Sequence, residues 1–258
     1  MGYESKCVAV PQLDADTRER MAALYLSIYD GSSRELFLTD LAAKDEALLI
    51  FARSTLEGGG ASELVGFSTL AIDDRSWQGR PTRVVYSGDT LIMREHWGQQ
   101  QLAVAFITRL GELKRQAPER FLYWLLLVKG HRTFKYLPAF GNSFWPHWSI
   151  DRSDLKPLVD ELASEKFGSE YNPVSGVVEF PTSRGHLRAE LAEPEPEELT
   201  REAVQAFLQR NPGFRQGHEL VCLCEVELDN MTPLAQQLFL QGPPSRGTLG
   251  GVSQGAPT

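Results

Sequence analysis

The sequence has few cysteines, no long apolar run and no excess of basic charge. Its 258 residues include 3 cysteines, which excludes a small disulfide scaffold and indicates a reducing compartment. No apolar run approaches the ~18 residues that a membrane helix needs. The first twenty residues carry charged side chains, among them Glu4, Lys6 and Asp14, and no apolar core. We therefore expect no signal peptide, no membrane contact and a cytoplasmic protein.

The charge balance and the missing motifs exclude several classes of function. Acidic residues outnumber basic ones 34 to 26, and the formal net charge is −8, which argues against a general nucleic-acid binder. The chain has no Gly-x-Ser-x-Gly elbow, no P-loop, no His-Glu-x-x-His and no dinucleotide-binding glycine motif. Cys222 and Cys224 lie near His218 but lack further ligands at zinc spacing. We expect no metal site and two buried, small apolar side chains instead.

Hydrophobic periodicity predicts an α/β fold built on a mixed sheet. The composition, 42% hydrophobic and 23% charged, is typical of a globular domain. In the first half we expect a loop over 73–81, a glycine turn over 58–60, helices over 15–30, 98–116 and 133–140, and strands over 46–53, 63–72, 82–93 and 121–128. In the second half the pattern predicts helices after Ser153 and over 200–209, and strands over 176–180 and 219–228.

The chain divides into three parts in this interpretation. Residues 1–150 form a core with the order α, β, β, β, α, β, α. Residues 151–240 form a C-terminal α/β extension that either completes the sheet or covers a substrate cleft. Residues 241–258 are rich in Gly, Pro, Ser and Thr, which predicts a disordered tail.

The most informative segment is the junction between the strand over 82–93 and the following helix. A helix entered directly from a strand exposes free backbone N–H groups and a positive dipole end, which suit a phosphate group. The order of elements and this junction resemble the GNAT superfamily of acyl-CoA-dependent N-acyltransferases. In that family a turn with the pattern Arg/Gln-x-x-Gly-x-Gly/Ala follows the fourth strand and holds the coenzyme A pyrophosphate.

The matching positions make a degenerate version of that motif. They are Trp97, Gly98, Gln99, Gln100, Gln101 and Leu102. Gly98 fits the glycine that often follows the basic residue, whereas Trp97, Gln100 and Leu102 replace the basic residue and the other two small residues. The resemblance covers residues 15–148 and implies that these six residues hold the pyrophosphate of an acyl-CoA. It also implies that Ile92 and Met93 pair with the pantetheine arm. An ordinary strand-to-helix corner with a structural glycine is the alternative.

The resemblance implies catalytic roles for a tyrosine and a base. Tyr136 would protonate the departing thiolate, and Asp89, on the strand before the junction, would take the proton of the amine. His131 is a further candidate base, as are Glu95 and His147. The alternatives are a tyrosine packed in the core, an Asp89 that serves a turn or bulge, and histidines with structural roles.

Aromatic and basic side chains gather after the strand over 121–128. Residues 121–148 hold nine of the 25 aromatic side chains. These side chains either line a pocket for a bulky acyl group or pack in the hydrophobic core. Lys129, His131, Arg132 and Lys135 make a basic cluster in an acidic chain. This cluster suits the 3′-phosphate of coenzyme A or an acidic substrate, and a solvated helix start explains it equally well.

We therefore expect an acyltransferase that moves an acyl group from a coenzyme A thioester to an amine of a small molecule by direct attack. Two alternatives stay open. One is a non-catalytic scaffold, which the missing glycines favour. The other is an acyltransferase or decarboxylase that takes its thioester from an acyl carrier protein, which brings no adenine or 3′-phosphate. A homodimer also stays open.

Overall fold

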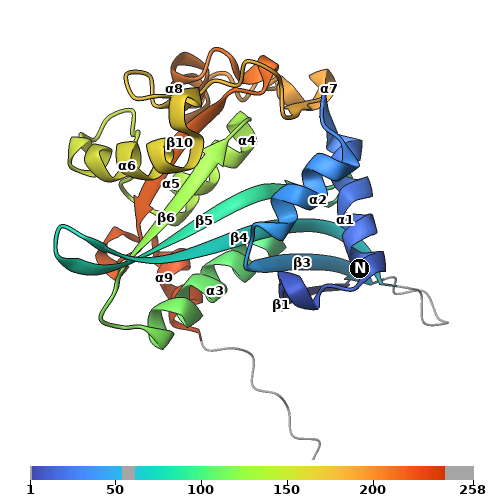
Figure 1. Cartoon of the computed structure of the whole chain (residues 1–258), viewed down its shortest axis with the longest axis horizontal. Helices are drawn as coiled ribbons and strands as arrows, with labels where there is room; N and C mark the ends of the chain where they lie inside the picture. The colour runs from blue at the N-terminus through green and yellow to red at the C-terminus, as the bar shows by residue number, and fades with distance from the viewer. Residues whose placement is uncertain (1, 54–61, 242–258) are drawn as a thin grey trace, which may run out of the picture.

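A computed structural model describes residues 2–53 and 62–241, and its centre is one mixed β-sheet (Figure 1). The strand order is β1-β3-β4-β5-β6-β10-β8-β7. Among the described strands of this sheet, β5 and β6 form the one parallel pair, and the other neighbours are antiparallel. The strands span Gly2–Ala9 (β1), Glu46–Arg53 (β3), Glu63–Trp77 (β4), Arg80–Ile92 (β5), Phe121–Val128 (β6), Tyr171–Asn172 (β7), Val177–Val178 (β8) and Glu219–Glu225 (β10). The expected α/β fold with a mixed sheet is confirmed.

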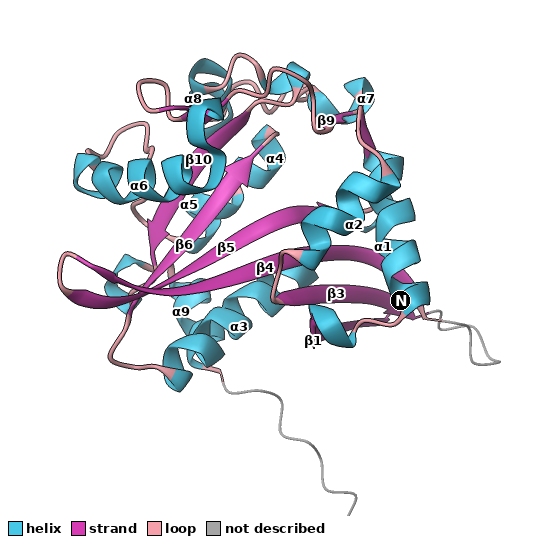
Figure 2. Ribbon diagram, viewed as in Figure 1, coloured by secondary structure: helices cyan, strands magenta, loops and turns pink. Residues whose placement is uncertain are grey.

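Helices cover both faces of the sheet, as Figure 2 shows. One face packs against α1 (Ala15–Ile28), α2 (Arg34–Ala42) and α6 (Lys156–Phe167). The other face packs against α3 (Gln101–Gln116), α4 (His131–Phe134), α5 (Tyr136–Phe140), α8 (Glu202–Arg210) and α9 (Pro233–Leu240). Alternation along β6 explains this division, because Trp124 and Leu126 contribute to the cluster under α3 while Leu125 packs on the α6 side. A short pair, β2 (Tyr29–Asp30) with β9 (His186–Leu187), and helix α7 (Ala189–Ala192) lie beside α1.

The parallel strands β5 and β6 diverge and open the sheet. Their pairing runs from Thr82 with Phe121 to Ser87 with Leu126 and stops there. Next to this point β5 carries one extra residue relative to β4, because the register changes between the pairs Thr69–Gly88 and Phe67–Leu91. This β-bulge bends the strand, and Asp89 within it has a positive φ of 33°. Figure 2 shows β5 and β6 separating beyond the bulge.

Most predicted elements of the first half occur where the pattern placed them. The strands over 46–53 and 121–128 have the expected bounds, whereas the helix over 133–140 is divided into α4 and α5. The expected loop over 73–81 is wrong. Here β4 and β5 continue to Trp77 and from Arg80, joined by Gln78 and Gly79 with φ of 49° and 76°. Two positive φ angles suit a tight hairpin turn. The polar composition of residues 73–81 had instead indicated a loop.

Several elements were not predicted from the sequence, and the longest of them are β1, α2 and α9. Strand β1 is an edge strand with polar residues on it, so it lacks a clear alternating pattern. Helix α2 begins at the N-cap Ser33, whose side chain accepts the Leu36 N–H. The expected glycine turn over 58–60 and, apart from Gln241, the predicted tail over 241–258 lie outside the described residues.

Residues after 150 contribute to the same sheet and the same helical layer. Strand β10 pairs with β6 from Leu220–Val128 to Glu225–Tyr123. Helix α9 packs on α3, where a Cβ on Gly111 would lie 2.0 Å from the carbonyl oxygen of Phe239. The two helices therefore touch through a backbone contact that only glycine permits. The division at residue 150 stays a prediction.

Candidate functional site

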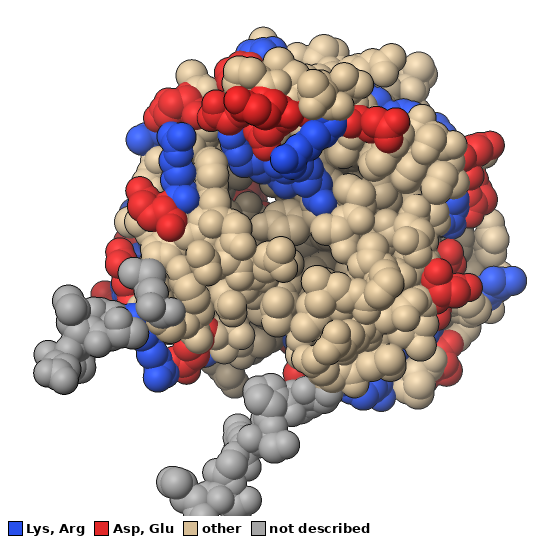
Figure 3. Space-filling model, turned by 180° about the vertical axis from the view of Figure 1, so that it is seen from behind, with Lys and Arg blue, Asp and Glu red and all other residues tan. Residues whose placement is uncertain are grey.

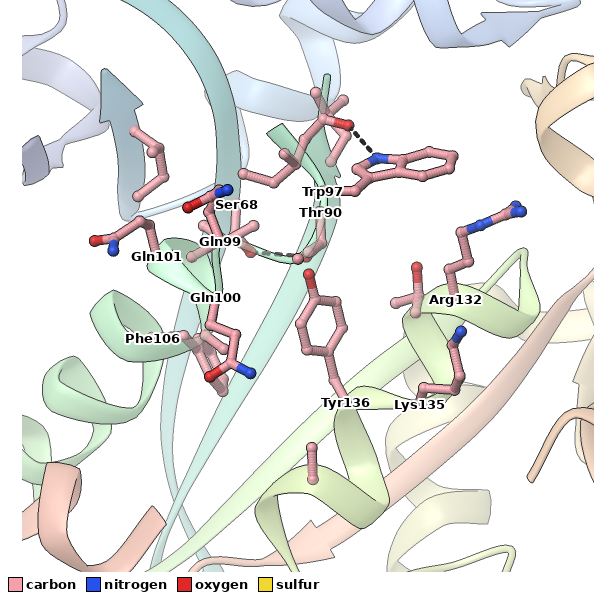
Figure 4. A pocket seen from close by; sticks show the side chains of 18 of the residues that line it. Ser68, Thr90, Trp97, Gln99, Gln100, Gln101, Phe106, Arg132, Lys135 and Tyr136 are labelled. Atoms are coloured by element: carbon pink, nitrogen blue, oxygen red, sulfur yellow. Dashed lines mark hydrogen bonds between the residues drawn. The ribbon is translucent and has the colours of Figure 1, made fainter. Parts of the chain in front are cut away.

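A pocket of about 700 Å³ lies where β5 and β6 diverge. Its walls come from β4, β5 and β6, from the segment that leads into α3, and from α3, α4, α5 and α9. The segment 187–201 borders it as well, through Leu187, Leu191, Glu198 and Arg201. Figure 4 shows part of this pocket from close by, with Tyr136 facing the residues of β4, β5 and α3. The bulged strand and the uncovered start of α3 thus share one cavity.

The turn into α3 presents its backbone to this pocket. Gly98 has a φ of 82°, and the space around its missing Cβ is open. Gln100 is the N-cap residue, with a left-handed φ of 56° and no side-chain hydrogen bond to the helix. The first amide groups of α3 therefore have no side-chain cap, and the helix dipole adds positive potential there. Gln100 thus adopts a backbone conformation that favours glycine.

Four basic side chains line the pocket, namely Arg94, Arg132, Lys135 and Arg201. The Arg132 guanidinium lies 4.6 Å and that of Arg94 5.8 Å from the centre of the Trp97 ring. Trp97 also donates from Nε1 to the Ile92 carbonyl oxygen at 2.9 Å. Figure 3 shows Lys and Arg side chains gathered beside a hollow, next to a row of acidic side chains. Positive charge concentrated at a cavity in an acidic chain favours an anionic ligand.

His131, the first residue of α4, is buried and pairs with the partly buried Glu198. His131 is 1% exposed, and its Nε2 lies 3.0 Å from Glu198 Oε2. Burial raises the pKa of Glu198, but hydrogen bonds from Lys135, the Glu195 amide and His131 together hold that pKa at about 2. Because Glu198 is ionised, Nε2 carries a proton and Nδ1 of neutral His131 has a free lone pair. Nδ1 has no hydrogen-bond partner among the described residues.

The charge on His131 follows from its surroundings. Burial is the largest influence on its pKa and lowers it below the ordinary value, and the neighbouring Arg132 lowers it further. Glu198 acts in the opposite direction. The net result is a lowered pKa, so His131 is neutral near pH 7.

Tyr136 also lines the pocket, with its hydroxyl directed toward the side where Ser68 and Thr90 lie (Figure 4). Burial raises the pKa of Tyr136 above its ordinary value. The hydroxyl is therefore protonated at neutral pH and is available as a proton donor.

Asp89 lies at the bulge but does not line the pocket. Its Oδ2 accepts from Thr69 Oγ1 at 3.5 Å. Burial raises the pKa of Asp89, and the charges of Lys44 and Lys129 oppose that rise. Lys129 itself pairs with Glu219 at 3.2 Å, so this member of the predicted basic cluster is already neutralised.

The structure brings most of the predicted site residues together. The pocket lining includes Tyr136, His131, Ile92, Trp97, Gly98, Gln99, Gln100, Gln101 and Leu102. Met93, like Asp89, is outside that lining. The Met93 N–H donates to Val65 at 2.9 Å, and the Ile92 carbonyl is occupied by Trp97. Pairing of these two groups with a pantetheine arm would need at least the Trp97 contact to change.

Sequence reasoning missed Glu198, Arg201 and the hydroxyl pair Ser68–Thr90. Glu198 and Arg201 lie in a segment whose many Glu and Pro residues are typical of a connector. Nothing in its sequence distinguishes these two residues as members of a site. Ser68 and Thr90 are ordinary strand residues until the hairpin places their hydroxyls 2.8 Å apart. Within residues 2–53 and 62–241, no group of three His, Cys, Asp or Glu side chains is arranged to hold a metal ion. No described helix is both long and apolar enough to span a membrane.

No family model matches the chain, and no curated protein sequence matches it. A solved structure from Enterococcus faecalis, described as a "Probable N-Acyltransferase", is 11% identical, with 64% of this chain and 43% of that chain covered and a TM-score of 0.41. The chain thus spans less than half of that protein. Arabidopsis thaliana NAA60 in complex with acetyl-CoA is 14% identical (55% and 87% covered, TM-score 0.39). An Escherichia coli GNAT family N-acetyltransferase in complex with CoA is 14% identical (54% and 70% covered, TM-score 0.35). One of these three solved structures is described as a GNAT family member.

Proposed function

We propose that the protein transfers an acyl group from an acyl-CoA thioester to an amine of a small molecule. One observation carries this proposal. A single pocket joins an uncapped helix N-terminus, a basic rim and a protonated tyrosine, and it is bordered by a neutral histidine whose buried Nδ1 has no hydrogen-bond partner among the described residues. Each of these groups answers one need of thioester aminolysis: anion binding, a proton donor and a proton acceptor.

Acyl-CoA would enter as co-substrate, and the residues present suit its anionic groups. The backbone amides after Gln100 would hold the pyrophosphate. Arg94 and Arg201 have no ion-pair partner among the described residues, so they are free to meet phosphate oxygens. Arg132 is held over Trp97 and donates to the Leu191 carbonyl at 2.6 Å, which fixes its position on the rim.

In the reaction the amine nitrogen would attack the thioester carbonyl carbon, so that a C–N bond forms and the C–S bond breaks. His131 Nδ1 would accept the proton of the attacking amine, while Glu198 holds the opposite side of the ring. Tyr136 would donate its proton to the leaving thiolate and later regain one from solvent. We assign the base to His131 in place of Asp89, because His131 borders the pocket and Asp89 does not.

Replacing Tyr136 by phenylalanine tests the acid role directly. We expect Tyr136→Phe to keep CoA affinity and to lower the rate of amide formation by about 10²-fold or more, the scale of general acid catalysis. Binding is measured by calorimetric titration, and turnover by thiol release with a panel of small amines. Wild-type turnover in the variant would remove the acid role from Tyr136.

A carrier-protein thioester is the second candidate donor, and one observation favours it. Glu198 already pairs with Arg132 and Lys135 and accepts a hydrogen bond from His131, three members of the cluster that the sequence offered as a 3′-phosphate site. A carrier protein delivers phosphopantetheine without that phosphate and needs fewer free cations. Binding of a loaded acyl carrier protein without binding of CoA would select this donor. A non-catalytic scaffold would bind neither donor productively and would show no thiol release.

A further inference from the structure

The carboxylate of Glu198 is surrounded by four donor groups. Its Oε2 lies 3.0 Å from His131 Nε2, 3.1 Å from the Glu195 backbone nitrogen and 3.6 Å from the Arg132 guanidinium. Its Oε1 accepts a hydrogen bond from Lys135 Nζ. Both oxygens are therefore paired, and two of their four partners are cations. Charge-assisted contacts of this kind are the strong hydrogen bonds of proteins.

The same set of donors has the chemistry of a binding site for an external oxyanion. Two cations, a ring N–H and a main-chain amide converge on two oxygens, and proteins bind carboxylates and phosphates with such groups. The side chains of His131, Arg132 and Lys135 border the pocket, as does Glu198. Figure 4 shows Arg132 and Lys135 on the same side of Tyr136. The place of the anion is thus taken by a carboxylate of the chain itself.

Glu198 is the one partly buried residue of the segment 195–200. Its side chain is 14% exposed, whereas the other five residues of the segment are exposed, among them the apolar Leu199 at 45%. Movement of the Glu198 side chain away from the donors would therefore uncover little apolar surface. The cost of exchanging this carboxylate for another anion is mainly the loss of its polar contacts.

We propose that His131 Nε2, Arg132, Lys135 and the Glu195 amide form a binding site for a carboxylate or phosphate group, with Glu198 as its built-in occupant. An outside anion must displace the Glu198 carboxylate, which is tethered beside the donors at a high effective concentration. A small free anion therefore competes poorly. An anionic group that belongs to a larger ligand competes better, because other parts of the pocket hold the same molecule. Glu198 thus makes the pocket selective against small free anions.

Such an exchange would leave the tautomer of His131 unchanged. An oxyanion in the place of the Glu198 carboxylate accepts the same Nε2 proton, so Nδ1 keeps its free lone pair. The inference goes beyond the proposed acyl transfer, because it concerns the binding of an anion and no catalytic step.

Removal of the built-in occupant tests the site directly. Glu198→Ala deletes a CH₂–carboxylate group, which has the shape of acetate, and leaves the donors beside the freed space. Acetate and inorganic phosphate are each titrated calorimetrically into the wild type and the variant, with chloride balancing the ionic strength. If Glu198 fills the site for about nine-tenths of the time or more, its removal strengthens anion binding at least about tenfold. A larger gain for phosphate would identify a phosphate site, and a larger gain for acetate a carboxylate site.

Two further variants separate an anion site from a general effect of charge. Glu193→Ala removes a carboxylate that pairs with Arg215 and lies outside the pocket lining. It should bind both anions as weakly as the wild type does. Adding Lys135→Met to Glu198→Ala removes one cation of the site and should abolish most of the gain. Urea denaturation shows whether each variant is folded.

The outcomes are independent of coenzyme A and of turnover. Anion binding that is no tighter in folded Glu198→Ala than in the wild type would overturn the inference, and so would an equal gain in Glu193→Ala. If Glu198→Ala does not fold, Glu198→Gln replaces it and should also bind the anions more tightly, since a neutral amide holds the cations less firmly. The acyltransferase proposal stands or falls with CoA binding and thiol release instead.

Discussion

At the residue scale, the turn before α3 holds glutamine in a backbone conformation that favours glycine. Gln100 has φ 56° and ψ 4°, a left-handed conformation that costs an L-residue about 1–2 kcal/mol. The conformation persists because the Gln100 carbonyl accepts the Val104 N–H at 2.9 Å and so starts the helix. Backbone strain at a single residue beside a pocket is typical of functional sites, here one in which main-chain amide groups would bind the ligand.

The same scale explains the pH dependence that we expect. Burial and Arg132 lower the pKa of His131, so the neutral base is lost only when the pH falls below that lowered value. The value of kcat/KM should therefore decline on the acid side with an apparent pKa below 6.5. Glu198 raises the pKa of His131. Glu198→Gln should thus move the acid limb to still lower pH, as measured by pH–rate profiles.

The control for this experiment is Glu193→Gln. Glu193 pairs with Arg215 at the same connector and interacts with His131 through its charge but not through a hydrogen bond. Its acid limb should therefore move much less than that of Glu198→Gln. An acid limb that stays in place in Glu198→Gln would contradict the assignment of His131 as base.

At the element scale, the contact between α3 and α9 depends on one glycine. In an exposed helix, Gly→Ala raises the free energy of unfolding by about 1 kcal/mol because alanine favours helix. A Cβ on Gly111 would lie 2.0 Å from Phe239 O, so α9 would have to move. We expect Gly111→Ala to lower the free energy of unfolding by about 1–3 kcal/mol, the cost of overpacking. Urea denaturation measures the change.

The opposite result has a clear meaning. A gain in stability from Gly111→Ala would show that α9 does not pack on α3 in solution. Because Leu238 of α9 lines the pocket, that result would also remove one wall of the site.

Elements with a strong local pattern were predictable from the sequence, and those that depend on partners were not. The apolar run over 121–128 predicts β6 with its bounds. Asp89 shows the limit, because one extra residue in β5 decides which way each side chain after it points. Periodicity places Asp89 on the strand but cannot place the bulge, and so could not show that Thr90 would line the pocket while Asp89 would not.

At the scale of the whole molecule, the site combines parts that are distant in the sequence. His131 and Glu198 are 67 positions apart, and Glu198 is the partner that orients the proposed base. The chain is acidic overall, with a formal net charge of −8, yet four basic side chains line its pocket. The overall negative charge follows from the composition, but the basic side chains at the pocket are seen only in the folded chain. A ligand that carries several negative charges fits this local field.

The most direct test of the account is calorimetric titration of CoA into the full chain at low and at raised ionic strength. We predict micromolar binding that weakens as salt screens the basic rim. Gln100→Gly should bind CoA more tightly than wild type, because it removes a side chain beside the amide groups and suits the left-handed turn. Absence of CoA binding at both ionic strengths, by wild type and variant alike, would contradict the central claim that this pocket takes an acyl-CoA.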